Sequence, residues 1–393
     1  MTPGARVQAA IDLLDETIAA AGTGGAAADT LIARYFKTRR YAGSKDRRAV
    51  RDLVYAAIRR AGERPVSGRA AMLGLVTDRP DLAPLFDGSE HAPAVIAPDE
   101  LVARAGVAPA WLLAKLDTLD AAERAALLDR ATLDLRVNRL KADRVAVLTE
   151  LPDAAATPHA PDGIRLPEGT KIEGLAAYIE GRIEVQDEGS QLLALACGVE
   201  PGMTVVDLCA GAGGKTLALA AAMADQGRLI ACDTDRRRLG NLMPRAVRAG
   251  VTIVEPVLLD PQREREALND HIKRADVVLV DAPCSGTGTW RRNPEARWRL
   301  TRARLDNLVT LQAHVLDVAA SLVRPGGTLV YAVCSLIDDE GAGGFAAFLT
   351  RHPKWRAVPI DLPAGVAHGA GIRLTPHHDG TDGFFVARAK APC

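Results

Sequence analysis

The stretch MTVVDLCAGAGGKTLALAAAMAD, residues 203–225, decides the fold. A short apolar run of β-type residues leads into a glycine-rich turn, and a helical stretch follows the turn. The same alternation of apolar runs and helical stretches begins at about residue 186. Continuous apolar strands that alternate with amphipathic helices predict a parallel sheet covered on both faces. We therefore predict a doubly wound α/β domain over residues 186–393, with FFVARAK, residues 384–390, as a candidate edge strand.

The sequence before this domain has a different character. Residues 1–75 place apolar side chains at three- and four-residue spacing, which predicts helices. Residues 76–100 are rich in Pro, Asp and Gly, as in a linker, and the helical spacing then resumes. Short strand-like runs with Pro and Gly come next. We predict an all-helical domain at 1–131 and a connecting α+β subdomain at 132–185 before the doubly wound domain.

Unusual polar residues follow the apolar runs of the predicted sheet. Cys209 and the glycines end the first run, Asp233 the second, Asp281 the fourth and Cys334 the fifth. In a doubly wound sheet, ligands bind outside the carboxyl ends of the strands, and chemistry concentrates on loops held by a rigid scaffold. We therefore predict the functional site at this edge of the sheet.

The glycine-rich turn is the first candidate for ligand binding. Glycines let a backbone approach a ligand closely, and the following helix offers free N–H groups. A phosphate-binding loop needs G-x-x-x-x-G-K-[ST], but Cys209 occupies its first glycine position. S-adenosylmethionine is the alternative ligand, with Asp233 placed to accept hydrogen bonds from its ribose. The predicted cofactor contacts are Cys209, Ala210, Gly211, Ala212, Gly213, Gly214, Lys215 and Asp233.

Six cysteines occur in the chain. None forms a C-x-x-C pair or has histidines at zinc spacing, so we predict no metal site. A disulfide framework is not expected in a long chain that shows no signal peptide. Cys197 and Cys232 fit small buried residues. One cysteine at a strand end is usually structural as well, but Cys284 and Cys334 at two ends of one predicted sheet favour chemistry.

The motifs VVDLCAGAGGKT, VLVDAPCSGTG, VYAVCS, QDEGSQ and DGFF lie between residues 186 and 385. Together they resemble the motif set of the RsmB/Sun-type family of RNA (cytosine-5) methyltransferases. SKDRRAVRDLVYAAIRR, residues 44–60, more loosely resembles the NusB-like helical domain of bacterial members, and LRVNRLK, residues 135–141, the start of their connecting subdomain. The resemblance implies a Rossmann-like class I methyltransferase domain behind a NusB-like RNA-binding domain.

The resemblance also implies a reaction. Cytosine C5 is a poor nucleophile, whereas a thiolate that adds to C6 produces an enamine whose C5 can attack the methyl sulfonium of S-adenosylmethionine. By resemblance, Cys334 is the nucleophile and Cys284 aids product release. Asp281 lies by the methyl group and the target base, and Lys215 positions or polarises the base. The further implied cofactor contacts are Asp281, Asp260 and Arg238.

The chain departs from the family pattern in three places. The cofactor loop reads CAGAGGKT where CAAPGGKT is common, Val333 stands where Thr is usual, and Pro261 follows Asp260 where Gly is usual. None of these changes touches the two cysteines, Asp281 or Lys215. They bear on the details of cofactor contact rather than on the reaction.

Charge distribution supports an RNA partner although the total charge does not. The chain has 49 basic and 49 acidic residues, yet residues 31–70 hold twelve basic side chains against three acidic ones. A second arginine cluster follows DAPCSGTG, at residues 291–304. Such runs are either solvated helix faces or phosphate contacts. The predicted RNA contacts are Arg39, Arg40, Arg47, Arg48, Arg291 and Arg292.

The expected partner is ribosomal RNA, with transfer RNA second. The E-N-V triplet typical of DNA cytosine methyltransferases is not found. A non-catalytic RNA-binding factor and a P-loop NTPase stay as alternatives. No apolar run reaches the ~18 residues of a membrane helix, and the N-terminus does not look like a secretory signal. We therefore expect a cytoplasmic protein, without membrane contact, that is monomeric.

Overall fold

The computed structural model describes all residues 1–393 and divides into two compact units. A helical unit consists of Met1–Arg130 and Thr289–Thr301, and an α/β unit consists of Ala131–Gly288 and Arg302–Cys393. The first boundary falls one residue before the expected domain limit at residue 131. The segment Thr289–Thr301, expected from the sequence to belong to the α/β domain, folds with the helical unit instead.

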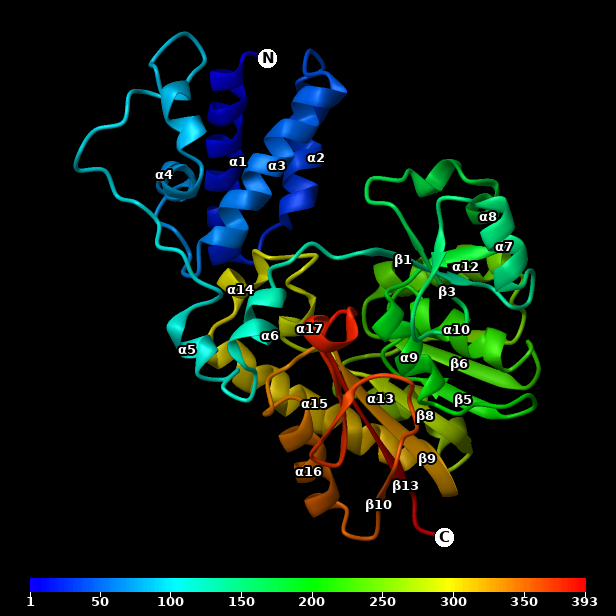
Figure 1. The fold of residues 1–393 in the computed structure, drawn as a ribbon. Helices are drawn as coiled ribbons and strands as arrows, with labels where there is room; N and C mark the ends of the chain where they lie inside the picture. Colours follow the sequence, from blue (N-terminus) through cyan, green and yellow to red (C-terminus); the bar gives the residue numbers. More distant parts are fainter. The chain divides into compact units, whose positions relative to one another are not determined.

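Helices α1 to α4 and η1 of the helical unit pack around one apolar core, to which Trp298 of α14 also contributes (Figure 1). Fully buried side chains such as Leu13, Val54 and Met72 bring α1, α3 and α4 together. Thr2 begins the first helix by accepting a hydrogen bond from the backbone N–H of Ala5 at 3.2 Å. The helices are α1 (Pro3–Thr23), α2 (Ala28–Thr38), α3 (Ser44–Arg60), α4 (Gly68–Asp78), η1 (Pro80–Leu85), α5 (Ala110–Leu113), α6 (Ala121–Ala126) and α14 (Ala296–Arg299).

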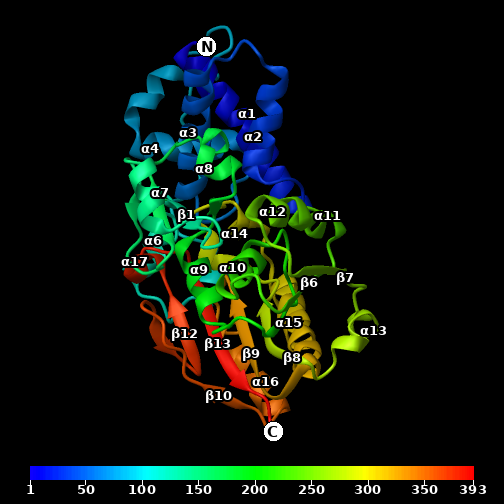
Figure 2. The ribbon, with the colours of Figure 1, turned by 90° about the vertical axis from the view of Figure 1, so that its right-hand side faces the viewer.

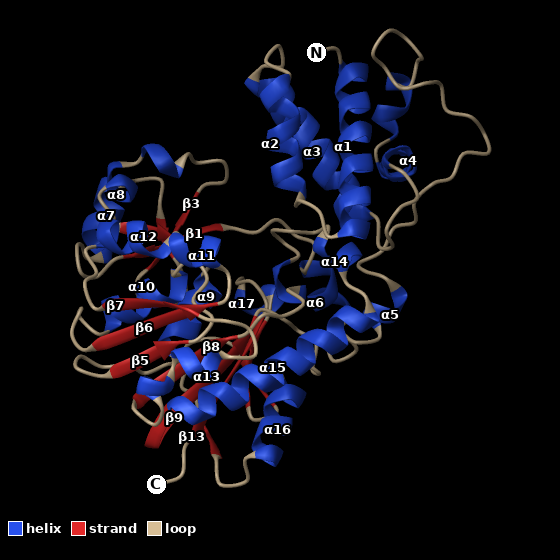
Figure 3. Cartoon of the chain, turned by 180° about the vertical axis from the view of Figure 1, so that it is seen from behind, coloured by secondary structure: helices blue, strands red, loops and turns tan.

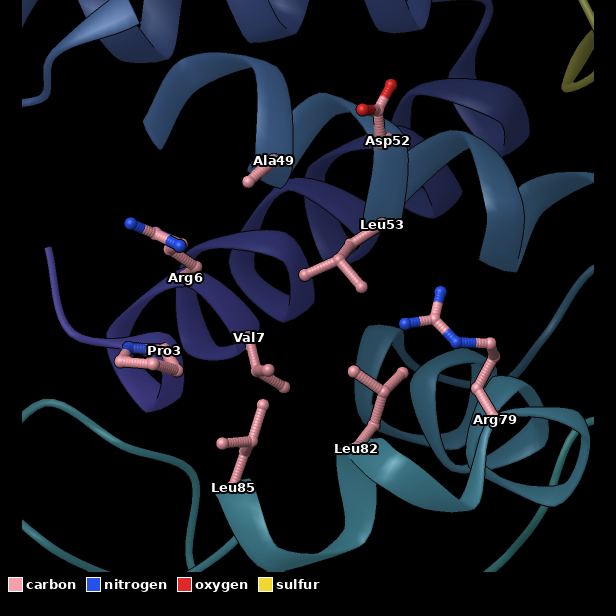
Figure 4. A pocket seen from close by; sticks show the side chains of 9 residues that line it. All are labelled: Pro3, Arg6, Val7, Ala49, Asp52, Leu53, Arg79, Leu82 and Leu85. Atoms are coloured by element: carbon pink, nitrogen blue, oxygen red, sulfur yellow. The ribbon is translucent and has the colours of Figure 1, made fainter. Parts of the chain in front are cut away.

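A hollow of about 310 Å³ lies among α1, α3 and η1 (Figure 4). Its floor is apolar, with Val7, Leu53 and Leu82. Its two arginines are engaged nearby: Arg6 donates to Asp46 at 2.8 Å, and Arg79 pairs with Asp81 at 2.7 Å. The hollow is therefore a feature of helix packing whose cationic groups are already neutralised.

The segment Thr289–Thr301 joins the helical unit through polar contacts at two helix ends. The Glu295 carboxylate accepts from the backbone N–H of Ala28, the first residue of α2, at 3.0 Å. The guanidinium of Arg297, which is fully buried, donates to three carbonyls at the end of α3: Ile58 at 2.6 Å, Arg59 at 3.1 Å and Ala61 at 2.8 Å. These groups satisfy backbone atoms that a helix leaves unpaired at its ends.

Replacing Arg297 by alanine removes the guanidinium donor from the carbonyls of Ile58 and Arg59, while that of Ala61 keeps the Trp298 indole N–H at 3.1 Å. We expect the Arg297→Ala variant to lose about 3 kcal/mol of unfolding free energy, because unmet buried acceptors keep their full desolvation cost. Urea denaturation measures the loss. Arg34→Ala removes an exposed arginine of α2 and is expected to change the free energy by less than about 0.5 kcal/mol. Equal losses in the two variants would contradict this role.

The α/β unit is built on a nine-stranded sheet with the order β11-β12-β13-β9-β8-β5-β6-β7 and β10 beside β13. Strands β7, β6, β5, β8 and β9 pair in parallel, and each of the other strands pairs antiparallel with its neighbour. The strands are β5 (Thr204–Asp207), β6 (Arg228–Asp233), β7 (Val254–Leu258), β8 (Ala275–Asp281), β9 (Val323–Val333), β10 (Arg356–Val358), β11 (Val366–His368), β12 (Gly371–Leu374) and β13 (Phe384–Lys390).

Strand β13 differs from the expected edge strand, because it lies inside the sheet between β9 and β12. Phe384, Phe385, Val386 and Ala387 are all buried in succession. A strand whose consecutive residues are apolar is covered on both faces, whereas an edge strand with one wet face alternates. The edge interpretation of FFVARAK is therefore wrong.

Helices cover both faces of the sheet (Figures 2 and 3). Val205 faces a core shared with α9, α10 and α12, and its neighbour Val206 faces a core shared with α15 and α16. This alternation confirms the doubly wound arrangement. The helices are α9 (Glu188–Leu195), α10 (Gly214–Ala222), α11 (Arg236–Gly240), α12 (Leu242–Ala249), α13 (Glu264–Ala267), η3 (Asn269–His271), η4 (Thr287–Thr289), α15 (Arg302–Leu322), α16 (Ala342–Arg351) and α17 (Pro376–Asp379).

A second, antiparallel sheet of order β2-β3-β1-β4 occupies the region expected to connect the domains. It has its own core, which includes Leu135, Ile164 and Ile183. Its elements are β1 (Leu133–Val137), α7 (Arg144–Glu150), β2 (Ala155–Ala156), β3 (Gly163–Leu166), η2 (Ile172–Gly174), α8 (Ala176–Ile179) and β4 (Ile183–Val185). None of the protein's helices combines the length and apolar character needed to cross a membrane.

Candidate active site

The chain order of the strands reverses between β5 and β8. Strands β6 and β7 extend the sheet beyond β5, while β8 and β9 extend it on the other side. Side chains at the carboxyl ends of such strands border a crevice. Asp233 is the last residue of β6, Asp281 is the last residue of β8, and Cys334 directly follows β9. The structure thus brings the polar residues of the predicted strand ends to one edge.

The glycine loop fits tightly against neighbouring backbone and side chains. Gly211 and Gly213 have φ angles of 57° and 85°, which favour glycine. A Cβ atom on Gly213 would lie 2.1 Å from Cδ1 of Leu242, and one on Gly211 would lie 2.5 Å from Nη2 of Arg238. Gly213 precedes α10, so the N–H groups of the first turn of that helix face the loop. The loop therefore makes a tight turn that only glycine fits at these two positions, directly before the N-terminus of α10.

Acidic groups border this loop. The backbone N–H of Gly211 donates to one oxygen of the buried Asp233 carboxylate at 2.7 Å, and that of Asp235 donates to the other at 2.7 Å. Leu259 donates its N–H to the Asp233 carbonyl at 2.9 Å, which holds the loop after β7 beside β6. The exposed Asp260 lies in that loop. Asp233 and the Arg238 beside Gly211 thus border the glycine loop, and Asp260 lies in the loop that follows β7.

Lys215, in the first turn of α10, and Asp281 form an ion pair of 2.6 Å. Burial alone would lower the pKa of Lys215. The charge and hydrogen bond of Asp281, helped by the charges of Cys334 and Asp207, outweigh burial and raise this pKa above its usual value. Lys215 therefore remains an ammonium group, and the Cys334 sulfur is within its electrostatic range. The ring of Phe384 lies 6.0 Å from its Nζ.

The two cysteines singled out by the sequence face each other, with their Sγ atoms 3.3 Å apart. Both are partly buried. The hydrogen bond with Cys334, burial, and the charges of Cys334 and Glu340 raise the pKa of Cys284 well above its usual value. Cys284 therefore keeps its proton and can donate a hydrogen bond to the neighbouring sulfur. Thiolates, unlike thiols, are strong nucleophiles.

Asp207, at the end of β5, was missed in the sequence analysis. Burial is the main cause that raises its pKa to about 7, and the hydroxyl of Thr216 donates to its carboxylate at 2.7 Å. The bond ties the strand before the glycine loop to the helix after it. A carboxyl group inside an otherwise apolar strand was the available signal.

A model of the family described as 16S rRNA methyltransferase RsmB/F matches residues 194–390. Among known proteins, ribosomal RNA small subunit methyltransferase B of Sodalis glossinidius is 32% identical over 82% of this chain and 75% of its own length. The chain belongs to the RsmB/F family. The motifs VLVDAPCSGTG and VYAVCS, which carried the resemblance, lie within the matched region and hold the paired cysteines.

Two further comparisons describe the extent of this likeness. The probable ribosomal RNA small subunit methyltransferase B of Synechocystis sp. is 36% identical over 66% of this chain, and the match spans 60% of that relative. The crystal structure of PH0851 shares the fold with a TM-score of 0.76, covering 98% of both chains at 24% identity. The chain therefore shares its fold with a solved structure over nearly its whole length.

The arginines predicted to contact RNA occupy different environments in this RsmB/F chain. Arg40, Arg47 and Arg48 are exposed, while the Arg39 guanidinium stacks 3.6 Å from the ring centre of Tyr35. Arg291 is buried, and its guanidinium donates to the carbonyl of Arg130 at 3.2 Å. The expectation of an RNA contact at Arg291 does not fit this burial, because a phosphate contact needs an accessible guanidinium. Arg292 is partly buried, and we propose no RNA contact for it.

Adjacent glycines of the loop offer a matched test of its geometry. A Cβ at Gly213 meets Leu242 and requires a positive φ, whereas one at Gly214 has no neighbour within 4 Å. We expect Gly213→Ala to lower the unfolding free energy by more than about 1 kcal/mol, and Gly214→Ala to leave it unchanged or raise it by up to about 1 kcal/mol. Thermal and urea denaturation measure both. A neutral Gly213→Ala variant would argue against the constrained loop.

Proposed function

We propose that the protein transfers a methyl group from S-adenosylmethionine to C5 of a cytosine in RNA. The observation that carries the proposal is the pair of sulfur atoms 3.3 Å apart, next to the Lys215–Asp281 ion pair and a glycine loop. Covalent activation of a pyrimidine needs a nucleophilic thiol and a nearby positive charge, and both are present. Family membership in RsmB/F supports the same reaction.

The residues of the glycine loop fit S-adenosylmethionine. Gly211 and Gly213 allow the tight positive-φ turn of this loop, in which Arg238 and Leu242 pack directly against the backbone. Each oxygen of the Asp233 carboxylate accepts one backbone N–H and keeps a lone pair for a ribose hydroxyl. Asp260 and Arg238 complete the proposed binding residues. When bound, S-adenosylmethionine supplies an electrophilic methyl group.

Cys334 is the proposed nucleophile. Its thiolate adds to C6 of the cytosine, and the electrons of the C5–C6 double bond then make C5 nucleophilic. Lys215 supports this step in two ways: its ammonium charge lies within electrostatic range of Cys334, and it offers a donor to the base. Asp281 holds the Lys215 side chain in place through their 2.6 Å contact.

Cys284 has the proposed role of aiding product release. Once C5 carries the methyl group, it loses its proton to a base. The electron pair of that C–H bond restores the C5–C6 double bond, and the C6–S bond breaks with its electrons on Cys334. A Cys284 S–H group 3.3 Å from the departing sulfur stabilises it by a hydrogen bond.

Ribosomal RNA is the proposed substrate. The relatives from Sodalis glossinidius and Synechocystis sp. are named for methylation of small-subunit ribosomal RNA. The exposed arginines Arg40, Arg47 and Arg48 suit contacts with phosphate groups. RNA enzymes of this kind act on a base that is taken out of its stack.

Two cysteine variants test the mechanism. We expect Cys334→Ala to bind S-adenosylhomocysteine normally but to lose methyl transfer by about a thousandfold or more, because no covalent activation remains. Cys284→Ala is expected to accumulate a covalent protein–RNA adduct that resists denaturing electrophoresis. Cys232→Ala, a change of a cysteine within β6, serves as the control. Full methyl-transfer activity of Cys334→Ala would contradict the assignment of Cys334 as the nucleophile.

The RNA target is tested in cells. Bisulfite sequencing of RNA from a strain that lacks the protein should show one small-subunit ribosomal cytosine converted to uracil that is protected in the parent strain. Complementation with the wild-type gene should restore protection, and Cys334→Ala should not. A new conversion confined to transfer RNA would redirect the proposal to that substrate.

A further inference from the structure

The two cysteine loops share a single buried carboxylate, that of Glu340. Glu340 is fully buried in the turn between β9 and α16. Its Oε2 accepts from the hydroxyl of Ser285 and, at 2.5 Å, from that of Ser335. Its Oε1 accepts from the backbone N–H of Ser285 at 2.7 Å and from Nε2 of Gln312 at 3.0 Å.

These contacts join equivalent points of two loops. Ser285 directly follows Cys284, and Ser335 directly follows Cys334. One carboxylate oxygen therefore holds both residues next to the reacting sulfurs. The Thr287 hydroxyl accepts from the N–H of Leu336 at 2.9 Å and lies 3.1 Å from the Ser335 hydroxyl, which adds a second tie between the same loops.

The carboxylate itself is anchored and saturated. The phenol of the buried Tyr331 in β9 donates to the Glu340 carbonyl at 2.5 Å. Gln312 of α15, which also donates to Glu340, donates to the carbonyl of Pro283 at 2.9 Å, immediately before Cys284. Four donors fill the roughly four lone-pair sites of a carboxylate. No acceptor capacity is left for a substrate, so Glu340 is suited to hold protein groups in place.

We propose that Glu340 is a positioning residue that sets the separation of the Cys284 and Cys334 sulfurs and thereby the efficiency of the reaction. The catalytic consequence rests on the proposed function, whereas the effect on sulfur separation does not. Neither serine can move away from the other loop without giving up a hydrogen bond to a buried charge, which is costly. Misplacement of reacting groups by about 1 Å can reduce a rate about a hundredfold.

Sulfur separation is measured by capture with phenylarsine oxide. This reagent bridges two nearby thiols: two As–S bonds form, both thiols lose their protons, and the arsenic-bound oxygen leaves as water. We expect Glu340→Ala to weaken capture by about tenfold or more, because the loops are no longer held together. Cys284→Ala gives the baseline for the four other cysteines. Glu340→Gln should stay close to the wild type, because its Oε1 can accept from two donors while its Nε2 donates to the two serine hydroxyls, which can turn to accept.

Asp276→Ala is the matched control. It removes a carboxylate from the opposite end of β8, where Asp276 accepts from the N–H of Thr204 at 2.8 Å. Its capture should equal that of the wild type. Should Glu340→Ala fail to fold, as judged by circular dichroism, the Ser285→Ala/Ser335→Ala double variant removes the same ties and should show the same weakened capture.

Methylation kinetics provide the second readout. Glu340→Ala should form the RNA adduct about a hundredfold more slowly, with the KM for S-adenosylmethionine unchanged, and Glu340→Gln should recover most of the rate. If Glu340→Ala or the double serine variant captures phenylarsine oxide as well as the wild-type protein does, the positioning role is wrong. If the wild-type protein methylates no RNA while capture follows the expected order, the proposed function fails and the positioning role stands.

Discussion

The parallel register of β8 on β9 is the constraint on which the site depends. Asp281 pairs with Ala332 in this ladder, so both strands end at the same level of the sheet. The loops that follow then start side by side, and Cys284 and Cys334 come within 3.3 Å although fifty residues separate them. A shift of one residue would turn the strand side chains to the opposite face. The backbone hydrogen bonds between β8 and β9 therefore set the relative positions of the two cysteine loops.

Burial of charge near this edge is balanced by specific partners. Lys215 is compensated by Asp281, and Glu340 by four hydrogen-bond donors. A charge without such partners would be costly to bury. Asp207 has fewer partners, and burial raises its pKa to about 7. The same dry surroundings make the remaining electrostatic interactions of the site stronger than they would be in water.

The sequence predicted the sheet, the strand ends and the pair of cysteines, because these depend on local alternation and on the order of strands. It did not predict the role of Glu340, which stands in the polar run Asp338-Asp339-Glu340 and looks solvent-exposed. Nor did it place Arg297 in the helical unit, since arginine clusters usually lie on the surface. Both residues are buried by long-range contacts, which composition and periodicity do not encode. Strand β13 was misplaced for the same reason: its sheet neighbours are set by tertiary pairing.

The 3.3 Å separation does not indicate which of the two thiols is the nucleophile, because it is a property of the pair. The asymmetry comes from the charges around them. Glu340 bonds the backbone next to Cys284, and its negative charge helps to hold the Cys284 proton in place. The ammonium group of Lys215 interacts electrostatically with Cys334. Cys284 thus has a carboxylate beside its loop, and Cys334, the proposed nucleophile, has an ammonium group within electrostatic range.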